Sequence, residues 1–191
     1  MLWKFSTGLQ EKSQIEETFQ RRIHIKIIFL DIDGVLNYAH CPYKLPDGWY
    51  FVDEKKIKLL KEIINATDAK IVLSSTWRVG WFDLEHNMHT TDAENFIRLR
   101  DKLREFNIEF LSRTPVTGRT RGKEITQWIQ NWNGEVIESF VILDDLPETE
   151  LTPYAENLVQ TSFSRGLLRR HVNKAIRILN KKYNLERDDS K

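Results

Sequence analysis

The stretch Lys26–Asn37, KIIFLDIDGVLN, guides the interpretation of the whole chain. Its apolar run, Ile27–Leu30, predicts a buried parallel strand, and two carboxylates follow where that strand ends. Asp31 and Asp33 are two residues apart, so an extended backbone directs both side chains to the same side. Buried strands seldom end in paired acids, because desolvated carboxylates repel each other unless a cation compensates them. Asp and Gly also favour ordinary turns, so other parts of the chain must decide between a turn and an active site.

Strands and helices are expected to alternate along most of the chain. A loop over 37–52 separates the first strand from a helix over 54–66, for which Asp53 is the expected N-cap. The later elements are expected in this order: a strand at 70–73, a loop at 79–90, a helix opened by a capping box at 91–94, a strand at 108–111, a helix from 122 to 132, strands at 140–143 and 157–160, and a last helix capped by Ser164. This alternation predicts an α/β fold with a doubly wound, Rossmann-like parallel sheet in three layers.

The length and composition of the chain indicate one globular domain. With 191 residues, the chain suits a single catalytic domain, expected at 26–185. An N-terminal extension at 1–25 is expected to be helical or mobile, and a charged tail is expected at 186–191. The formal net charge of +1 argues against a general nucleic-acid footprint, although it leaves room for a local basic patch.

Several classes of protein are excluded or disfavoured. The single cysteine, Cys41, excludes an intrachain disulfide framework and a cysteine-based zinc site. No apolar run approaches the ~20 residues of a membrane span, and residues 1–22 lack the apolar core of a secretory signal. We therefore expect a cytoplasmic protein with no membrane partner.

Polar side chains follow three of the predicted strands, and a lysine begins the helix before the fourth strand. Because ligands of parallel sheets bind beyond the carboxyl ends of the strands, these side chains are expected at one edge. Carboxylates in such a group can hold a hard divalent cation such as Mg²⁺, and a hydroxyl and an ammonium can neutralise phosphate oxygens. A carboxylate that remains can attack phosphorus. The group consists of Asp31, Asp33, Ser74, Ser75, Lys123, Asp144 and Asp145.

This ordered pattern resembles the haloacid dehalogenase (HAD) superfamily. The resemblance covers about residues 25–180, and the SSTWR stretch at 74–78 is similar to the HAD domains associated with RNA-repair proteins. It implies a HAD-like fold that is capless or carries only a small loop flap, and a phosphoric monoester hydrolase. The four matching motifs are DIDGVL at 31–36, IVLS at 71–74, Lys123 and VILDD at 141–145.

The resemblance implies distinct roles for the acids. Asp31 would be the nucleophile and also a ligand of Mg²⁺. Asp33 would protonate the leaving oxygen, later deprotonate water, and give the metal its backbone carbonyl. Asp145 is the preferred metal ligand of its pair, with Asp144 in support.

The resemblance also implies how the phosphate is bound. Ser74, which directly follows the apolar run, would bind the transferring phosphoryl group, with Ser75 as the second choice. Lys123 would balance the charge on Asp31 and phosphate. Arg78, four residues after Ser74, is a further candidate for contact with the ligand.

The spacing of the motifs leaves no room for a separate cap domain. An active site that no cap domain covers is open, and it favours a large phosphorylated substrate, either a nucleic-acid end or a phosphoprotein, with a nucleotide as the smaller candidate. Aromatic and arginine side chains in the loops could stack on bases and hold backbone phosphates, although packing inside the protein is the commoner use of such rings. These side chains are Trp49, Tyr50, Trp77, Arg78, Trp81, Arg119 and Arg121.

Two other interpretations compete with the phosphatase. A phospho-receiver signalling domain shares the fold, an acidic pair, a hydroxyl and a lysine, but it expects the phosphorylated aspartate at the end of the third strand, where this chain has Leu111 and Ser112. A non-catalytic phosphate-binding module is the third interpretation. It is disfavoured because no residue that the chemistry needs is missing.

Overall fold

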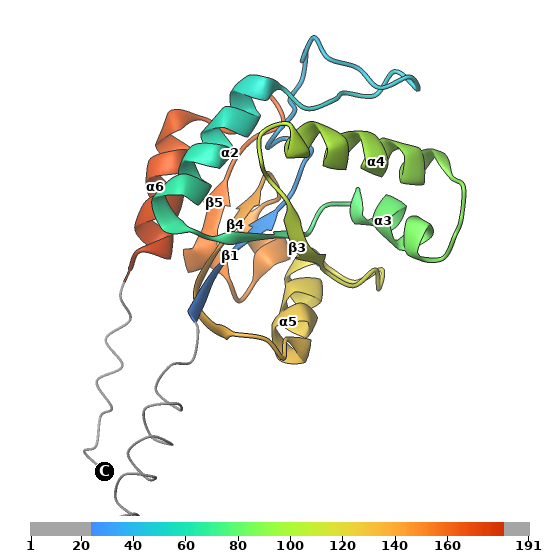
Figure 1. The fold of residues 1–191 in the computed structure, drawn as a ribbon. Helices are drawn as coiled ribbons and strands as arrows, with labels where there is room; N and C mark the ends of the chain where they lie inside the picture. The colour runs from blue at the N-terminus through green and yellow to red at the C-terminus, as the bar shows by residue number, and fades with distance from the viewer. Residues whose placement is uncertain (1–23, 182–191) are drawn as a thin grey trace, which may run out of the picture.

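The computed structural model describes residues 24–181 and contains a five-stranded, fully parallel sheet. The strands lie in the order β3-β2-β1-β4-β5, so β1 is central (Figure 1). The predicted tail at 186–191 lies outside the described residues, as does the predicted extension at 1–25 apart from His24 and Ile25, which begin β1. The strands are β1 (His24–Leu30), β2 (Lys70–Leu73), β3 (Phe110–Arg113), β4 (Val136–Asp144) and β5 (Leu158–Gln160).

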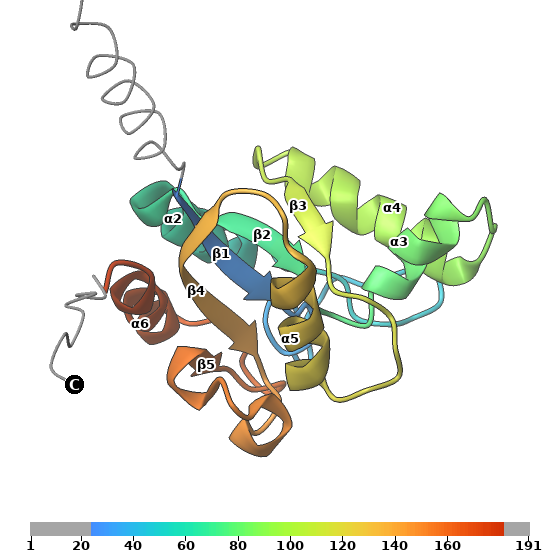
Figure 2. The same cartoon turned by 90° about the horizontal axis from the view of Figure 1, so that it is seen from below.

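Helices cover both faces of this sheet, which confirms the predicted three-layer α/β fold. Helices α2, α4 and α6 pack on one face, and α5 packs on the other with two short 3₁₀ helices (Figures 1 and 2). No helix in the described part of the chain has the length and hydrophobicity that crossing a bilayer requires. The helices are α2 (Glu54–Thr67), α3 (Arg78–Glu85), α4 (Thr91–Arg104), α5 (Arg121–Asn131), α6 (Arg169–Leu179), η1 (Glu148–Leu151) and η2 (Ala155–Asn157).

The two halves of the core follow from the alternation of side chains along β1. Ile28 and Leu30 belong to the apolar cluster under α2, α4 and α6. Ile27 and Phe29 point to the opposite face, where Trp128 of α5 meets the Phe29 ring edge-on at 5.3 Å. Because both faces of β1 are covered, its sequence is continuously apolar rather than alternating.

The register of the sheet aligns the ends of the three central strands. Leu30 pairs with Leu73 on one side and with Leu143 on the other. The pattern continues one residue further, since the Asp31 N–H donates to the Leu143 carbonyl and the Ser74 N–H donates to the Leu30 carbonyl, both at 2.9 Å. The polar residues that follow these strands are therefore brought to one edge, as the sequence predicts.

Some element boundaries differ from the prediction. The expected loop at 79–90 contains α3, because Trp81 stacks on Phe96 of α4 at 5.3 Å, and this packing stabilises a helix too short to be evident from periodicity. The third strand begins at Phe110, two residues later than expected. Thr90 rather than Thr91 caps α4, and α6 begins at Arg169, well beyond the expected cap at Ser164.

Candidate active site

Three aspartates meet at the carboxyl edge of the sheet. Asp31 follows β1, Asp144 ends β4, and Asp145 comes next in the chain; their carboxylates each offer an oxygen within 4.8 Å of the others. Asp31 and Asp144 are buried, and Asp145 is half-buried. Gly34 permits this arrangement, because its φ of +72° favours glycine and a Cβ there would collide with the Asp145 carboxylate.

Arg121 is the cation of this cluster. Its Nη1 donates to Asp31 Oδ1 and to Asp144 Oδ2, each at 3.1 Å, and its side chain is only 10% exposed. One guanidinium therefore bridges the residue that follows β1 and the residue that ends β4. From the sequence, Arg121 was expected only among the loop side chains that could contact a nucleic acid.

The prediction that Lys123 balances the charge on Asp31 is corrected by this geometry. Lys123 is exposed and lines a shallow surface hollow with Gln127 and Gln130. Successive residues of a helix turn by about 100°, so Lys123 lies about 200° around α5 from Arg121 and faces away from the carboxylates. The sequence locates the helix but not the residue at which it begins.

The packing of α5 explains why Arg121 reaches the cluster. A Cβ on Gly122 would lie 2.9 Å from the Thr152 carbonyl, so glycine lets the first turn of α5 approach the segment around η1 closely. Further along the helix, Trp128 Nε1 donates to Ser112 Oγ of β3 at 2.8 Å. These contacts fix the rotation of α5 and hence the direction of Arg121.

The electrostatics of the cluster favour an additional cation. Burial, and next the charge of Asp144, raise the pKa of Asp31 to about 7, although Arg121 and a hydrogen bond with Ser75 oppose this. Burial also raises the pKa of Asp144, against the effect of Arg121. For Asp145, burial and then the charge of Asp31 raise the pKa. Three carboxylates thus share one arginine.

The cluster fits a hard divalent cation such as Mg²⁺. All its side-chain ligands are carboxylate oxygens, which Mg²⁺ prefers. A bound cation would offset the repulsion that raises these pKa values. Among the predicted metal ligands, Asp31, Asp144 and Asp145 come together through their side chains, whereas the Asp33 side chain is engaged elsewhere.

Asp33 is held by three N–H donors. Asn37 Nδ2 donates to its Oδ1 at 2.7 Å, and Trp77 Nε1 donates to its Oδ2 at 3.0 Å. Trp49 Nε1 makes a longer contact of 3.4 Å with Oδ1. Asn37 is fully buried and also accepts from the Gly34 N–H, so it couples Asp33 to the turn that follows β1. Asn37 was not among the predicted site residues, because its only signal in the sequence is a polar residue four positions after Asp33.

The two serines behave differently. The side chain of Ser75 acts on Asp31 and lowers the pKa of this carboxyl. Ser74 is fully buried, and its Oγ has no hydrogen-bond partner among the described residues. The hydroxyl beside the candidate nucleophile is therefore that of Ser75, the second choice of the sequence analysis.

Arg78 lies inside the protein, where its guanidinium contacts other protein groups. Its Nη2 pairs with the Glu124 carboxylate, and its Nη1 donates to the carbonyls of Ser74 and Ser75 at 3.3 and 2.7 Å. Its Nε contacts the Pro115 carbonyl at 3.4 Å. The expected contact between Arg78 and phosphate is therefore corrected: this side chain joins the loop after β2 to α5.

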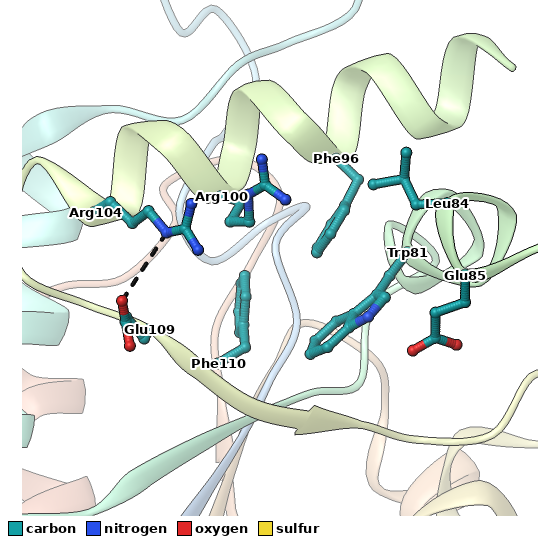
Figure 3. Close-up of a pocket in the computed structure, with 8 residues that line it drawn as sticks. All are labelled: Trp81, Leu84, Glu85, Phe96, Arg100, Arg104, Glu109 and Phe110. Carbon is teal, nitrogen blue, oxygen red and sulfur yellow. Dashed lines mark ion pairs between the residues drawn. The ribbon is translucent and has the colours of Figure 1, made fainter. Parts of the chain in front are cut away.

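Two cavities lie near α3, and one of them borders Asp33. The first, of about 330 Å³, has Asp33, Trp49 and Trp77 in its wall. The second, of about 380 Å³, lies between α3, α4 and β3, with Trp81, Phe96 and Phe110 gathered on its floor and two arginines and two glutamates around them (Figure 3). It contains none of the aspartates. Its other lining residues are Leu84, Glu85, Arg100, Arg104 and Glu109.

Comparison with known proteins identifies a family over most of the chain. A family model described as "HAD domain in Swiss Army Knife RNA repair proteins" matches residues 27–172, which is most of the chain. The matched range includes the aspartate cluster, Asp33 and Arg121. The match implies a phosphatase-type hydrolase. None of the curated proteins compared with the chain matches it.

Proposed function

This chain belongs to the HAD domains of Swiss Army Knife RNA repair proteins, and from that premise we propose that it is a Mg²⁺-dependent phosphatase. It hydrolyses a phosphate monoester through an aspartyl-phosphate formed on Asp31. The observation that carries this proposal is the buried group of Asp31, Asp144 and Asp145 bridged by Arg121. A buried acidic group with one arginine is poorly stable by itself and suits the binding of a cation together with an anion.

The first half of the reaction transfers the phosphoryl group to the protein. An Asp31 carboxylate oxygen attacks phosphorus, a new O–P bond forms, and the bond from phosphorus to the leaving oxygen breaks. Asp33 gives its proton to that oxygen, so the leaving group departs as a neutral alcohol. Arg121, whose Nη1 donates to Asp31, orients this carboxylate and provides positive charge beside the phosphoryl oxygens.

The second half releases inorganic phosphate. Asp33, now ionised, accepts a proton from water, and the water oxygen attacks phosphorus while the Asp31–phosphorus linkage breaks. Asn37 and Trp77 hold the Asp33 carboxylate in one orientation during both proton transfers. Asp33 thus returns to its protonated form and Asp31 to its ionised form.

The metal would be held by Asp31, Asp144 and Asp145, with the backbone carbonyl of Asp33 as a further ligand. When bound, Mg²⁺ supplies positive charge that stabilises the phosphoryl oxygens in the transition state. The residues of the chain provide the nucleophile, the proton and the remaining positive charge.

The proposed substrate is a phosphate monoester on a large molecule. Among residues 24–181, the segments between the strands are loops, single helices and the α3–α4 pair, none of which forms a separate cap domain. The loop between β1 and α2 projects from the carboxyl edge of the sheet and suits a small flap (Figure 1). An active site without a cap domain can accept a nucleic-acid end or a phosphoprotein, and it can also accept a nucleotide.

The experiment that tests the proposal is a screen of phosphorylated compounds with and without Mg²⁺. Wild-type protein is expected to release phosphate only with the metal, and Asp31→Asn is expected to lose roughly 10⁴-fold or more of the turnover, because the covalent nucleophile has no replacement. Asp101→Asn, on the exposed surface of α4, serves as the matched control.

Two outcomes would contradict the phosphatase. One is retention by Asp31→Asn of more than about a tenth of the wild-type turnover, equivalent to ~1.4 kcal/mol of barrier. The other is stoichiometric phosphorylation by acetyl phosphate without further release, which would identify a signalling switch. Circular dichroism of each variant separates loss of chemistry from loss of fold.

A further inference from the structure

Three aromatic side chains form a continuous group beside the candidate active site, here called the aromatic strip: Trp49, Tyr50 and Phe163. Tyr43 is exposed on the same loop as Trp49 and Tyr50. Tyr43, Trp49 and Phe163 are 47%, 54% and 36% exposed, and they are the only exposed aromatic side chains of this size among residues 24–181. All three lie on the loops that follow β1 and β5, at the carboxyl edge of the sheet. Exposed rings gathered at one edge indicate a binding surface.

The rings of the strip touch by their edges. The centroids of Trp49 and Tyr50 are 6.3 Å apart at an interplanar angle of 64°, and those of Tyr50 and Phe163 are 5.8 Å apart at 74°. Trp49 and Phe163 keep exposed surface outside these contacts. Lys44 Nζ lies 3.1 Å from the centroid of the Tyr50 ring and adds positive charge beside the strip.

The strip is held in place although it is exposed. The Trp49 N–H donates to Asp47 Oδ1 at 2.9 Å, and Asn95 of α4 donates to the other oxygen of Asp47 at 3.0 Å. The two loops are joined by the Ala39 N–H, which donates to the Phe163 carbonyl at 2.6 Å. A fixed ring loses little entropy when a ligand stacks on it, so exposure of this kind favours binding.

We propose that the aromatic strip binds the unpaired bases of a single-stranded nucleic acid whose terminal phosphate is hydrolysed at Asp31. This inference rests on the proposed phosphatase and specifies its substrate. Trp49 connects the two regions, because its Nε1 contacts Asp33 while its ring is more than half exposed. Lys44 and the exposed Arg165, which follows Phe163 by two residues, supply charge for backbone phosphates.

The type of surface favours nucleic acid over a phosphopeptide. Phosphorylated peptides are commonly recognised by a cluster of arginines, and no member of the aromatic strip is an arginine. Every base has two π-faces, and stacking on an aromatic side chain is worth about 1–3 kcal/mol per base. The group formed by Trp81, Phe96 and Phe110 differs from the strip, because Phe96 stacks face to face with both of the other rings (Figure 3).

The test measures phosphate release by the full chain in the presence of Mg²⁺ and compares three substrates. These are a short single-stranded oligonucleotide with a terminal phosphate, the same oligonucleotide with an abasic terminal residue, and a small alkyl phosphate. Both 3′- and 5′-phosphorylated oligonucleotides are used. The base-bearing oligonucleotide is expected to exceed the abasic one in kcat/KM by about tenfold, the equivalent of one stacked base. Phe163→Ala is expected to reduce the preference for oligonucleotide over alkyl phosphate by at least about fivefold, mainly through KM.

Leu111→Ala on β3 is the matched control, because Leu111 is similarly exposed but lies on the edge strand of the sheet. Equal kcat/KM for base-bearing and abasic oligonucleotides, or a preference for phosphopeptides, would overturn the inference. If no substrate releases phosphate, the proposed phosphatase activity is contradicted. Fluorescence anisotropy of the two labelled oligonucleotides then tests separately whether the aromatic strip binds bases. Base-dependent binding that Phe163→Ala weakens would support the strip, and base-independent binding or none would overturn it.

Discussion

At the scale of single residues, the candidate site depends on which side chain of the first turn of α5 meets the aspartates. Arg121 donates from one nitrogen to both Asp31 and Asp144. Burial lowers the pKa of this guanidinium, but the two carboxylates outweigh burial and raise it, so Arg121 stays charged. Lys123, two residues later, is exposed on the opposite side of the helix. The two positions therefore make opposite predictions for mutagenesis.

We expect Arg121→Ala to lower kcat/KM for phosphate release by about 10²–10³-fold, the usual cost of removing one donor that stabilises transition-state charge. Lys123→Ala is expected to remain within about twofold of wild type, because its side chain does not reach the aspartates. Steady-state phosphate release by the two variants, measured side by side, checks the assignment. A large loss of activity in Lys123→Ala, together with an active Arg121→Ala, would show that the lysine rather than the arginine balances the charge at the site.

At the scale of elements, Arg78 and Glu124 connect four segments that surround the site. Arg78 begins α3 and donates to two carbonyls of the loop after β2, while Glu124 lies in α5. Glu124 also accepts from the N–H and the hydroxyl of Thr117, in the loop after β3. Both charged side chains are buried, so each depends on the other for its charge and its hydrogen bonds.

Removal of one member of this pair should therefore be more harmful than replacement of both. Arg78→Met is expected to lower the free energy of unfolding by about 3–5 kcal/mol, because it leaves the buried Glu124 carboxylate without its partner. For a domain of this size the fall in Tm is roughly 6–20 °C. The double variant Arg78→Met/Glu124→Leu is expected to recover part of this loss.

Thermal denaturation of the two single variants and the double variant checks the coupling. Strictly additive effects would mean that the ion pair does not link α3 to α5 energetically. Arg104→Met, whose ion pairs are on the surface, is the matched control and should change stability by less than about 1 kcal/mol.

At the scale of the whole molecule, the sequence was sufficient to predict the parallel sheet and the acids at its carboxyl edge. The apolar run before Asp31 identifies a central strand, and the alternation of elements then brings Asp144 and Asp145 to the same edge. The sequence was insufficient where a contact between distant segments decides the outcome. The eight-residue α3 forms because it packs on α4, and the choice of Arg121 over Lys123 depends on the residue at which α5 begins.

The dependence of stability on pH is another property of the whole molecule. In metal-free protein the pKa of Asp31 is raised by burial to about 7, so the folded state holds a proton that the unfolded state releases. The contribution of Asp31 to the free energy of unfolding is therefore most favourable at low pH, and it declines as the pH rises from about 4 to about 7. His171 has the opposite effect: burial lowers its pKa to about 4, so stability falls as the pH drops from 6.5 toward 4.

Asp31→Asn isolates the first of these effects. Without metal, this variant is expected to have a Tm several degrees above that of wild type at pH 8, and the difference should vanish near pH 4. Thermal denaturation in EDTA across this range checks the sign, and the contribution of His171 cancels because both proteins contain it. A difference in Tm that does not change with pH would contradict the raised pKa of Asp31.

The contacts of Trp49 and Trp77 with Asp33 also give the molecule an optical reporter of its own. Indole emission depends on exposure to water and on charge near the ring. Trp49 is more than half exposed and contacts the site, whereas Trp128 lies in the core, so changes at the site are expected to alter the emission of Trp49 rather than that of Trp128. Occupation of the site is therefore readable from the intrinsic fluorescence of unlabelled protein, before any bond to phosphorus is made or broken.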